Sequence, residues 1–215
     1  MANDEYLREA LVAIVAHEVR SPRVLEVMRQ MPRHTFVPEH PIEQAYADYP
    51  LPIGHGATIS QPTVVGMMSE ALELEGTERI LEVGTGSGYQ AAVLSRLARH
   101  VDTIEVIPEL AERARRALAE VGCTNIEVHV GDGWAGLPAL GPFDRIVVTA
   151  APEHLPASLV DQLADGGLLV VPVGPQTRDQ RLERHIKRNG HLVREDLGAV
   201  RFVPMVHGPG GDPAR

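Results

Sequence analysis

From residue 63 onward, short apolar runs alternate with stretches in which apolar positions recur at helical spacing. The runs that predict strands lie at 79–83, 101–106, 126–130, 144–149 and 168–173. The stretches that predict helices lie at 63–74, 88–98, 108–121 and 156–164. Strands that alternate with helices form parallel sheets with right-handed crossovers. We therefore predict an α/β fold, a doubly wound and mostly parallel sheet of the Rossmann-like kind.

The chain before this alternation has a different pattern. Residues 4–19 and 22–31 show helical spacing, and Ser21-Pro22 between them suits a helix N-cap followed by proline at the first helical position. Residues 32–62 are rich in Pro, Gly and His. We expect an irregular surface segment there, and its length is typical of a functional loop.

The end of the chain departs from the alternation again. Residues 180–188 and 192–203 predict two strands joined at Asn189-Gly190, which is a strong hairpin signal. The sheet should therefore end in an antiparallel strand pair. We expect residues 1–62 and 63–207 to belong to one domain, and the Gly/Pro-rich tail at 208–215 to be disordered.

Composition narrows the classes of function. No apolar run reaches the ~20 residues that span a bilayer, and the acidic N-terminus does not resemble a signal peptide. We expect a cytoplasmic monomer. The formal net charge of −9 argues against broad binding to nucleic acid. A single cysteine and scattered histidines indicate neither a disulfide nor a metal site.

The most informative segment is the glycine-rich turn Glu82-Val83-Gly84-Thr85-Gly86-Ser87-Gly88, which follows a predicted strand. Such a turn lets a ligand approach the backbone closely, and the next helix offers free N–H groups. A dinucleotide site would place its third glycine at position 89, which is Tyr89. The spacing found here resembles the cofactor turn of S-adenosylmethionine-dependent methyltransferases instead, so we expect that cofactor and not NAD.

Two further acids support a cofactor site. Glu105 lies at the end of the next predicted strand, where an acid typically binds ribose hydroxyls, and Asp132-Gly133 follows the third strand. Each acid alone is more typical of a solvated loop. The carboxyl ends of neighbouring parallel strands meet in one crevice, so Glu82, Glu105 and Asp132 together predict one binding site.

Ser60, in the segment from Gly54 to Pro62, is the candidate for contact with the substrate. No G-x-S-x-G elbow surrounds it and no Asp/His pair is evident, which argues against a nucleophile. A helix N-cap is the simpler interpretation, since Gln61-Pro62 can begin a helix. A cap and a hydroxyl that faces the substrate are compatible, so both interpretations stay open.

These motifs resemble those of the protein-L-isoaspartate O-methyltransferases over roughly residues 21–206. The matching blocks are 57–62, 81–90, 131–134, 143–151, 166–174 and 200–204. By this resemblance Ser60 takes the active-site serine position, whereas Thr58, Glu105, Asp132 and Gly133 take positions that contact the cofactor. Thr63 departs from the family, because a bulkier aromatic residue or His is expected after Ser-Gln-Pro.

The resemblance implies methyl transfer from S-adenosylmethionine to isoaspartyl carboxylates in damaged proteins and peptides. Such a carboxylate is ionised at neutral pH, so the reaction needs positioning and water exclusion but no base or metal. A methyltransferase for a small molecule is an alternative, against which the blocks at Ser60 and at 200–204 count. A non-catalytic binding module is another, against which the intact acids Glu82, Glu105 and Asp132 count.

Overall fold

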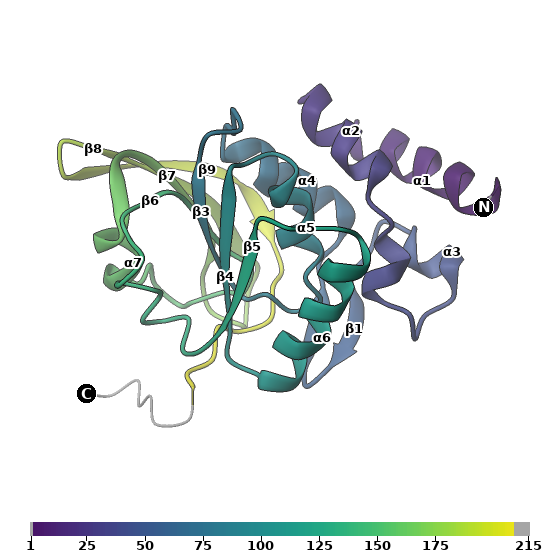
Figure 1. Ribbon diagram of the computed structural model, residues 1–215. Helices are drawn as coiled ribbons and strands as arrows, with labels where there is room; N and C mark the ends of the chain where they lie inside the picture. The colour runs from purple at the N-terminus through teal and green to yellow at the C-terminus, as the bar shows by residue number, and fades with distance from the viewer. Residues whose placement is uncertain (1, 209–215) are drawn as a thin grey trace.

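A central sheet of seven strands organises the protein, as the computed structural model of residues 2–208 shows (Figure 1). The strands are β3 (Arg79–Val83), β4 (His100–Glu105), β5 (Ile126–Val130), β6 (Phe143–Val148), β7 (Leu163–Val173), β8 (Gln180–Arg188) and β9 (His191–Val200). Their order in the sheet is β5-β4-β3-β6-β7-β8-β9. The first five are parallel, and β8 is antiparallel to both β7 and β9. This confirms the predicted doubly wound sheet and its antiparallel end.

Helices cover both faces of the sheet (Figure 1). They are α1 (Ala2–Val15), α2 (Pro22–Gln30), α4 (Pro62–Ala71), α5 (Tyr89–Ser95), α6 (Pro108–Glu120) and α7 (Ala157–Asp161). One face packs against α4, α5 and α6, with α1 and α2 as an outer layer, and α7 lies on the other face. Alternate strand residues serve the two cores, since Ile80 belongs to the larger cluster and Leu81 to the smaller one.

The segment 32–62 is more regular than its composition predicts. It contains a 3₁₀ helix η1 (Arg33–Phe36), a short helix α3 (Ile42–Ala45), and a hairpin of β1 (Leu51–Gly54) and β2 (Ala57–Ile59). The prediction of an irregular segment is therefore wrong for residues 51–59. Strands of three or four residues that contain Pro52 and Gly54 carry too little alternation to be detected from sequence.

Two element boundaries also differ from expectation. Helix α7 is shorter than predicted, and β7 begins at Leu163, so the Gly166-Gly167 pair lies inside a strand. A Cβ on Gly167 would lie 2.9 Å from the Asp144 carbonyl oxygen, which explains why glycine is needed where β6 and β7 shift register. The second strand of the terminal hairpin ends at Val200, and Pro204 then bridges to Ala151.

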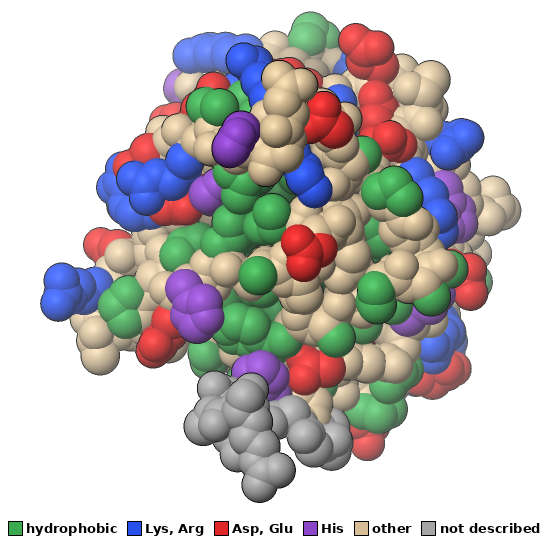
Figure 2. All heavy atoms as spheres, turned by 90° about the vertical axis from the view of Figure 1, so that its left-hand side faces the viewer, with side chains coloured by type: hydrophobic (Ala, Val, Ile, Leu, Met, Phe, Trp, Pro, Cys, Tyr) green, Lys and Arg blue, Asp and Glu red, His purple; other side chains and the backbone are tan. Residues whose placement is uncertain are grey.

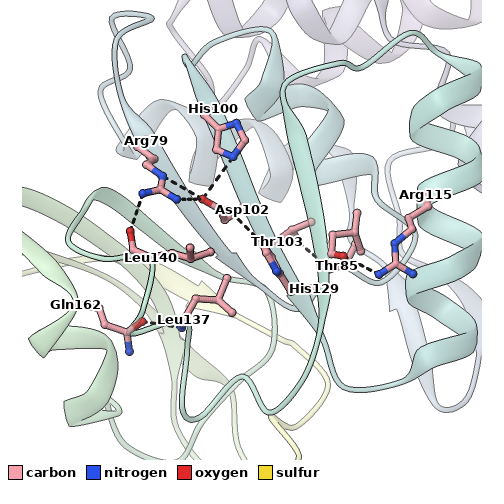
Figure 3. A network of polar contacts seen from close by, with 11 residues as sticks. Arg79, Thr85, His100, Asp102, Thr103, Arg115, His129, Leu137, Leu140 and Gln162 are labelled. Atoms are coloured by element: carbon pink, nitrogen blue, oxygen red, sulfur yellow. Dashed lines mark hydrogen bonds and ion pairs between the residues drawn. The ribbon is translucent and has the colours of Figure 1, made fainter.

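A buried polar network joins the first strands near their amino ends (Figure 3). Asp102 is fully buried, and it accepts hydrogen bonds from Arg79 Nε and Nη2 at 3.1 and 2.9 Å. His129 Nε2 on β5 lies 3.0 Å from its other oxygen. The guanidinium of Arg79 also lies over the ring of Phe143. The network links β3, β4, β5 and β6, and it lies away from the carboxyl ends at which a ligand would bind.

Within residues 2–208, no helix is both long enough and apolar enough to cross a bilayer. On the face drawn in Figure 2, acidic and basic side chains are interspersed around a strip of hydrophobic ones. The tail predicted to be disordered comprises residues 208–215, and all of it except Gly208 lies outside the described residues.

Candidate functional site

A cavity of about 270 Å³ opens at the carboxyl ends of β3, β4 and β6. Its wall includes the glycine-rich turn, the end of β4, the β1–β2 hairpin, the residues that follow β6 and residues 203–206. Six of the nine residues predicted from sequence to form the site are on its wall, namely Thr58, Ser60, Gly84, Gly86, Glu105 and Gly133. The fold therefore brings most of the candidate residues together.

The glycine-rich turn combines two functions. Gly84 has a φ of 99°, and a Cβ there would lie 2.5 Å from Thr149 Oγ1. Only glycine therefore fits at this position of the turn, next to Thr149. Gly86 also faces the cavity. Gly88, with a φ of 90°, is the N-cap of α5 and packs against Ala114 of α6. The structure thus places Gly88 off the cavity wall, where it allows two helices to approach.

Glu105 is buried at the end of β4 and is rigidly held. Its carboxylate accepts hydrogen bonds from the backbone N–H groups of Gly86, at 2.7 Å, and of Ile107, at 3.1 Å. A carboxylate has about four acceptor positions, so two remain for hydroxyl donors of a ligand. Because Glu105 lines the cavity, its place is the one expected of an acid that binds a ribose.

Glu82 lies beneath the turn and not on the cavity wall. Its side chain is fully buried, where Thr103 Oγ1 donates to Oε2 and Oε1 has no partner within residues 2–208. Thr103 in turn contacts Thr85 Oγ1 at 2.7 Å (Figure 3). Burial, with the nearby charge of Glu105, raises the pKa of Glu82 to about 8. The carboxyl is therefore mostly protonated at neutral pH and supports the turn from below.

Gly133 lines the cavity, whereas Asp132 lies beside it. One Asp132 oxygen accepts from the Trp134 N–H at 2.9 Å, and the other lies 3.2 Å from His207 Nδ1. The His207 ring stacks on Trp134 with 4.8 Å between centroids and 11° between planes. His207 thus covers the third predicted acid. Sequence reasoning missed it, because nothing distinguishes it from the other scattered histidines.

Ser60 lies between two cavities. Together with Thr58 it lines both the first cavity and a second one of about 400 Å³, whose wall also includes Gln61, Asp179, Arg201 and Phe202. Within the described chain the Ser60 hydroxyl makes no hydrogen bond, although the residue is half-buried. This hydroxyl is available to a ligand that spans the two cavities.

The capping role falls to other residues. Gln61 occupies the N-cap position of α4, and the N–H of Thr63 donates to Asp48 Oδ1 at 2.8 Å. Thr63 Oγ1 and Gln61 Nε2 also donate to Asp48, at 2.8 and 2.9 Å. The interpretation of Ser60 as the helix cap is therefore wrong, because Asp48 satisfies the start of the helix. The small side chain of Thr63 has a place in this arrangement, where it is buried against Asp48.

Arg33 is a second residue that sequence reasoning missed. It is fully buried, and it donates from Nη2 to the Ser60 carbonyl and from Nε to the Ala45 carbonyl, both at 2.9 Å. Its guanidinium lies 4.8 Å from the centroid of the Tyr89 ring, at the start of α5. Burial lowers its pKa to about 10, so it remains charged at neutral pH. Arg33 ties the backbone of Ser60 to the helix that follows the glycine-rich turn.

Comparisons with known proteins agree on one family. The family model described as protein-L-isoaspartate(D-aspartate) O-methyltransferase matches residues 7–210. A protein-L-isoaspartate O-methyltransferase from Gloeobacter violaceus is 51% identical over 187 residues, which cover 87% of this chain and 91% of the relative. Another, from Rhodopseudomonas palustris, is 54% identical over 202 residues, with coverages of 93% and 82%.

Solved structures give the same result at the level of the fold. A protein-L-isoaspartate O-methyltransferase superposes with a TM-score of 0.84 at 30% identity, covering 95% of this chain and 66% of that one. A Plasmodium falciparum protein-L-isoaspartate O-methyltransferase, solved in complex with S-adenosyl-L-homocysteine, has a TM-score of 0.81 at 24% identity, with coverages of 93% and 98%.

Proposed function

The chain belongs to the protein-L-isoaspartate O-methyltransferase family, and we propose that it divides the family's reaction between two cavities that meet at Ser60. The enzyme transfers a methyl group from S-adenosylmethionine to the free carboxylate of L-isoaspartyl residues in damaged proteins and peptides, which initiates their repair. The observation that carries the division is that Thr58 and Ser60 line both cavities.

The first cavity is suited to the cofactor. Gly84 leaves no room for a side chain between the turn and Thr149, and Glu105 presents a fixed carboxylate to the same space. Ile104, Val106 and Met205 form an apolar part of the wall, against which the adenine of the cofactor can pack. The cofactor supplies a methyl group on a positively charged sulfur when it is bound. We assign its binding to Thr58, Gly84, Gly86, Glu105 and Gly133.

Three predicted residues have supporting roles in this proposal. Glu82 underlies the turn through Thr103, and Gly88 starts the helix that follows it. Asp132 lies next to Gly133. Its carboxylate can accept a hydrogen bond from the amino group of the cofactor's adenine once His207 moves aside. Direct contact between Asp132 and the cofactor therefore depends on the position of His207.

The second cavity is suited to the acceptor peptide. Its rim includes Asp179 and Arg201, which are exposed and of opposite charge, around the apolar residues Pro50, Val64 and Phe202. An acceptor carboxylate that reaches past Ser60 enters the first cavity from this side. The peptide can then be held largely by its backbone, which allows many flanking sequences.

The reaction needs the protein to position the acceptor carboxylate, but it does not need a general base. The acceptor carboxyl, with an ordinary pKa near ~3.5, is ionised at neutral pH and attacks without losing a proton. Ser60 donates its hydroxyl to one carboxylate oxygen and thereby fixes the direction of the other. Arg33 holds the Ser60 carbonyl at 2.9 Å, which keeps this hydroxyl in place between the cavities.

Discrimination between isoaspartyl and aspartyl residues follows from this geometry. The isoaspartyl carboxylate is attached directly to the chain, whereas the aspartyl carboxylate extends one carbon farther. With the peptide backbone held in the second cavity, the aspartyl carboxylate misses the position of attack, and a displacement of about 1 Å costs on the order of a hundredfold in rate.

The test is methyl transfer from labelled cofactor to an isoaspartyl peptide and to its aspartyl twin. We expect a base-labile methyl ester on the isoaspartyl peptide and a rate at least on the order of a hundredfold lower on the twin. Equal rates on both peptides, or a product that is stable in base, would refute the proposed arrangement of acceptor and cofactor.

We also propose that residues 1–62 and 63–207 function as one domain in a cytoplasmic monomer without nucleic-acid partners. The shared apolar core supports one domain, since it extends from Leu11 through the sheet to Phe202. The net charge of −9 supports protein substrates over nucleic acid.

A further inference from the structure

The tip of the β8–β9 hairpin is a two-residue turn formed by Asn189 and Gly190. Both residues have positive φ angles, 50° and 77°, and Arg188 pairs with His191 across the turn. Asn189 and Gly190 are exposed. The β8–β9 hairpin extends to the left-hand edge of the molecule in Figure 1. Positive φ at both central positions is the geometry that Asn-Gly favours in tight hairpins.

The same dipeptide is chemically unstable. Glycine has no side chain to shield its backbone nitrogen, so this nitrogen can attack the side-chain carbonyl carbon of the preceding asparagine. In the hairpin, the Gly190 N–H donates to Asp165 Oδ1 at 3.2 Å. The carboxylate of Asp165 is therefore placed to accept the proton that the nitrogen gives up during attack.

Asn125 provides an internal contrast. Its Nδ2 donates to the carbonyl oxygens of Ser95, Ala98 and Arg99 at 3.0 to 3.2 Å, which fixes the side-chain amide. The next residue is Ile126, whose branched side chain shields the backbone nitrogen. Asn189 has neither protection, since it is exposed and is followed by glycine.

We propose that Asn189 is a site of isoaspartyl formation in this protein and that a second copy of the enzyme methylates the product. The Gly190 nitrogen bonds to Cγ of Asn189, the Cγ–Nδ2 bond breaks, and ammonia leaves with the proton from Gly190. Water then adds to the main-chain carbonyl carbon of the cyclic imide and breaks its bond to the Gly190 nitrogen. The chain now runs through Cγ, and the α-carboxylate is free. This proposal rests on the proposed function for its methylation step only.

Methylation must occur between two molecules. Asp179 lines the acceptor cavity, and the nine residues of β8 separate it from the hairpin tip. At about 3.3 Å per residue the tip lies roughly 30 Å from the acceptor cavity of its own chain. The additional backbone carbon also disturbs a turn that holds only two residues, so the damaged tip opens and becomes easier for another copy to bind.

The first experiment needs no catalysis. The intact protein is stored at 37 °C and neutral pH without cofactor. It is then digested with trypsin, which cleaves after Arg188 and after Arg194 and so releases the peptide 189–194. We expect this peptide to gain the mass of a carboxyl in place of a carboxamide and to co-elute largely with a synthetic isoaspartyl standard. The peptide that contains Asn125 should stay unchanged. A stable 189–194 peptide, or equal change at Asn125, would overturn the proposal.

Asp165→Ala tests the assigned proton acceptor. This variant should convert Asn189 several-fold more slowly, and it also removes the neighbouring Asp165-Gly166 pair as a competing source of isoaspartate. An unchanged rate would remove Asp165 from the cyclisation step. Asn189→Gln, which closes the imide ring poorly, should keep the 189–194 peptide intact.

The second experiment separates substrate from enzyme. Stored Ser60→Ala protein serves as substrate, and fresh Asn189→Gln protein with labelled cofactor serves as enzyme. We expect base-labile label in the 189–194 peptide of the stored protein and several-fold less when the stored protein also carries Asn189→Gln. A synthetic isoaspartyl peptide in a parallel tube reports the activity itself. Label on that peptide but none at 189–194 would overturn the methylation of a second copy, whereas no label on either would contradict the proposed function.

Discussion

Substituting Glu82 by glutamine should change how the stability of the enzyme depends on pH. Glu82 is fully buried, Thr103 donates to one of its oxygens, and the other oxygen has no partner within the described residues. Burial, reinforced by the charge of Glu105, raises its pKa from 4.5 to about 8. At a pH between 4.5 and about 8, the Glu82 carboxyl has lost its proton in the unfolded chain but keeps it in the folded chain. The stability that Glu82 contributes is therefore complete below pH 4.5 and is lost as the pH rises toward 8.

The magnitude follows from the size of the shift. Each pKa unit corresponds to about 1.4 kcal/mol, so the free energy of unfolding should fall by roughly 3 kcal/mol between pH 4.5 and 7 through this one group. Glutamine does not ionise and keeps an oxygen for Thr103. The difference in unfolding free energy between Glu82→Gln and the unmodified enzyme should then move in favour of the variant by roughly this amount over the same range.

The assay is urea unfolding of both proteins at pH 5, 6, 7 and 8 without cofactor. Comparing the two proteins at each pH cancels the titration of the other groups. Glu120→Gln, an exposed position at the end of α6, is the matched control and should leave the slope unchanged. A difference between Glu82→Gln and the unmodified enzyme that stays constant from pH 5 to 8 would refute the reasoning.

Two further substitutions test the sites that flank the turn. Glu105→Ala should weaken the binding of S-adenosylmethionine and its demethylated product by roughly 1.5–3 kcal/mol, and calorimetry should detect no NAD binding; unchanged affinity or tight NAD binding would contradict the assignment. Arg33→Lys cannot reach both carbonyls and stack on Tyr89, so it should lose roughly 1–3 kcal/mol of stability and much of its turnover while cofactor affinity is retained. Asn125→Ala, destabilised elsewhere, should keep its turnover, and equal losses in both variants would reduce Arg33 to a structural role.

The sheet and the cofactor turn could be predicted because their signals are local. The apolar run at 144–149 and the glycine spacing at Gly84, Gly86 and Gly88 report burial and turn geometry directly. The β1–β2 hairpin could not, since its strands are short and interrupted by Pro52 and Gly54. Their residues Leu51, Ile53 and Ile59 are buried in the larger core, which is a tertiary contribution that the local sequence does not reveal.

Within the site, residue types were easier to predict than their roles. Glu82 and Glu105 both end or nearly end a strand, yet only Glu105 reaches the cavity. Glu82 pairs with Thr103 in the sheet, so Glu105 lies two positions nearer the carboxyl ends, where the cavity opens. Arg33 was not expected in the interior, since arginine is rarely fully buried without partners. Its partners are backbone carbonyls of Ala45 and Ser60, which leave no trace in the sequence.

The claim that Ser60 orients the acceptor between two cavities is tested most directly by single-turnover methyl transfer in Ser60→Ala. The rate is measured with saturating cofactor and isoaspartyl peptide, and the cofactor Kd and the melting temperature are measured on the same sample. The account predicts a loss of rate on the order of a hundredfold, with the Kd and the melting temperature almost unchanged, because Ser60 does not cap α4. A normal rate, or a loss of rate that is matched by a loss of cofactor affinity, would contradict it.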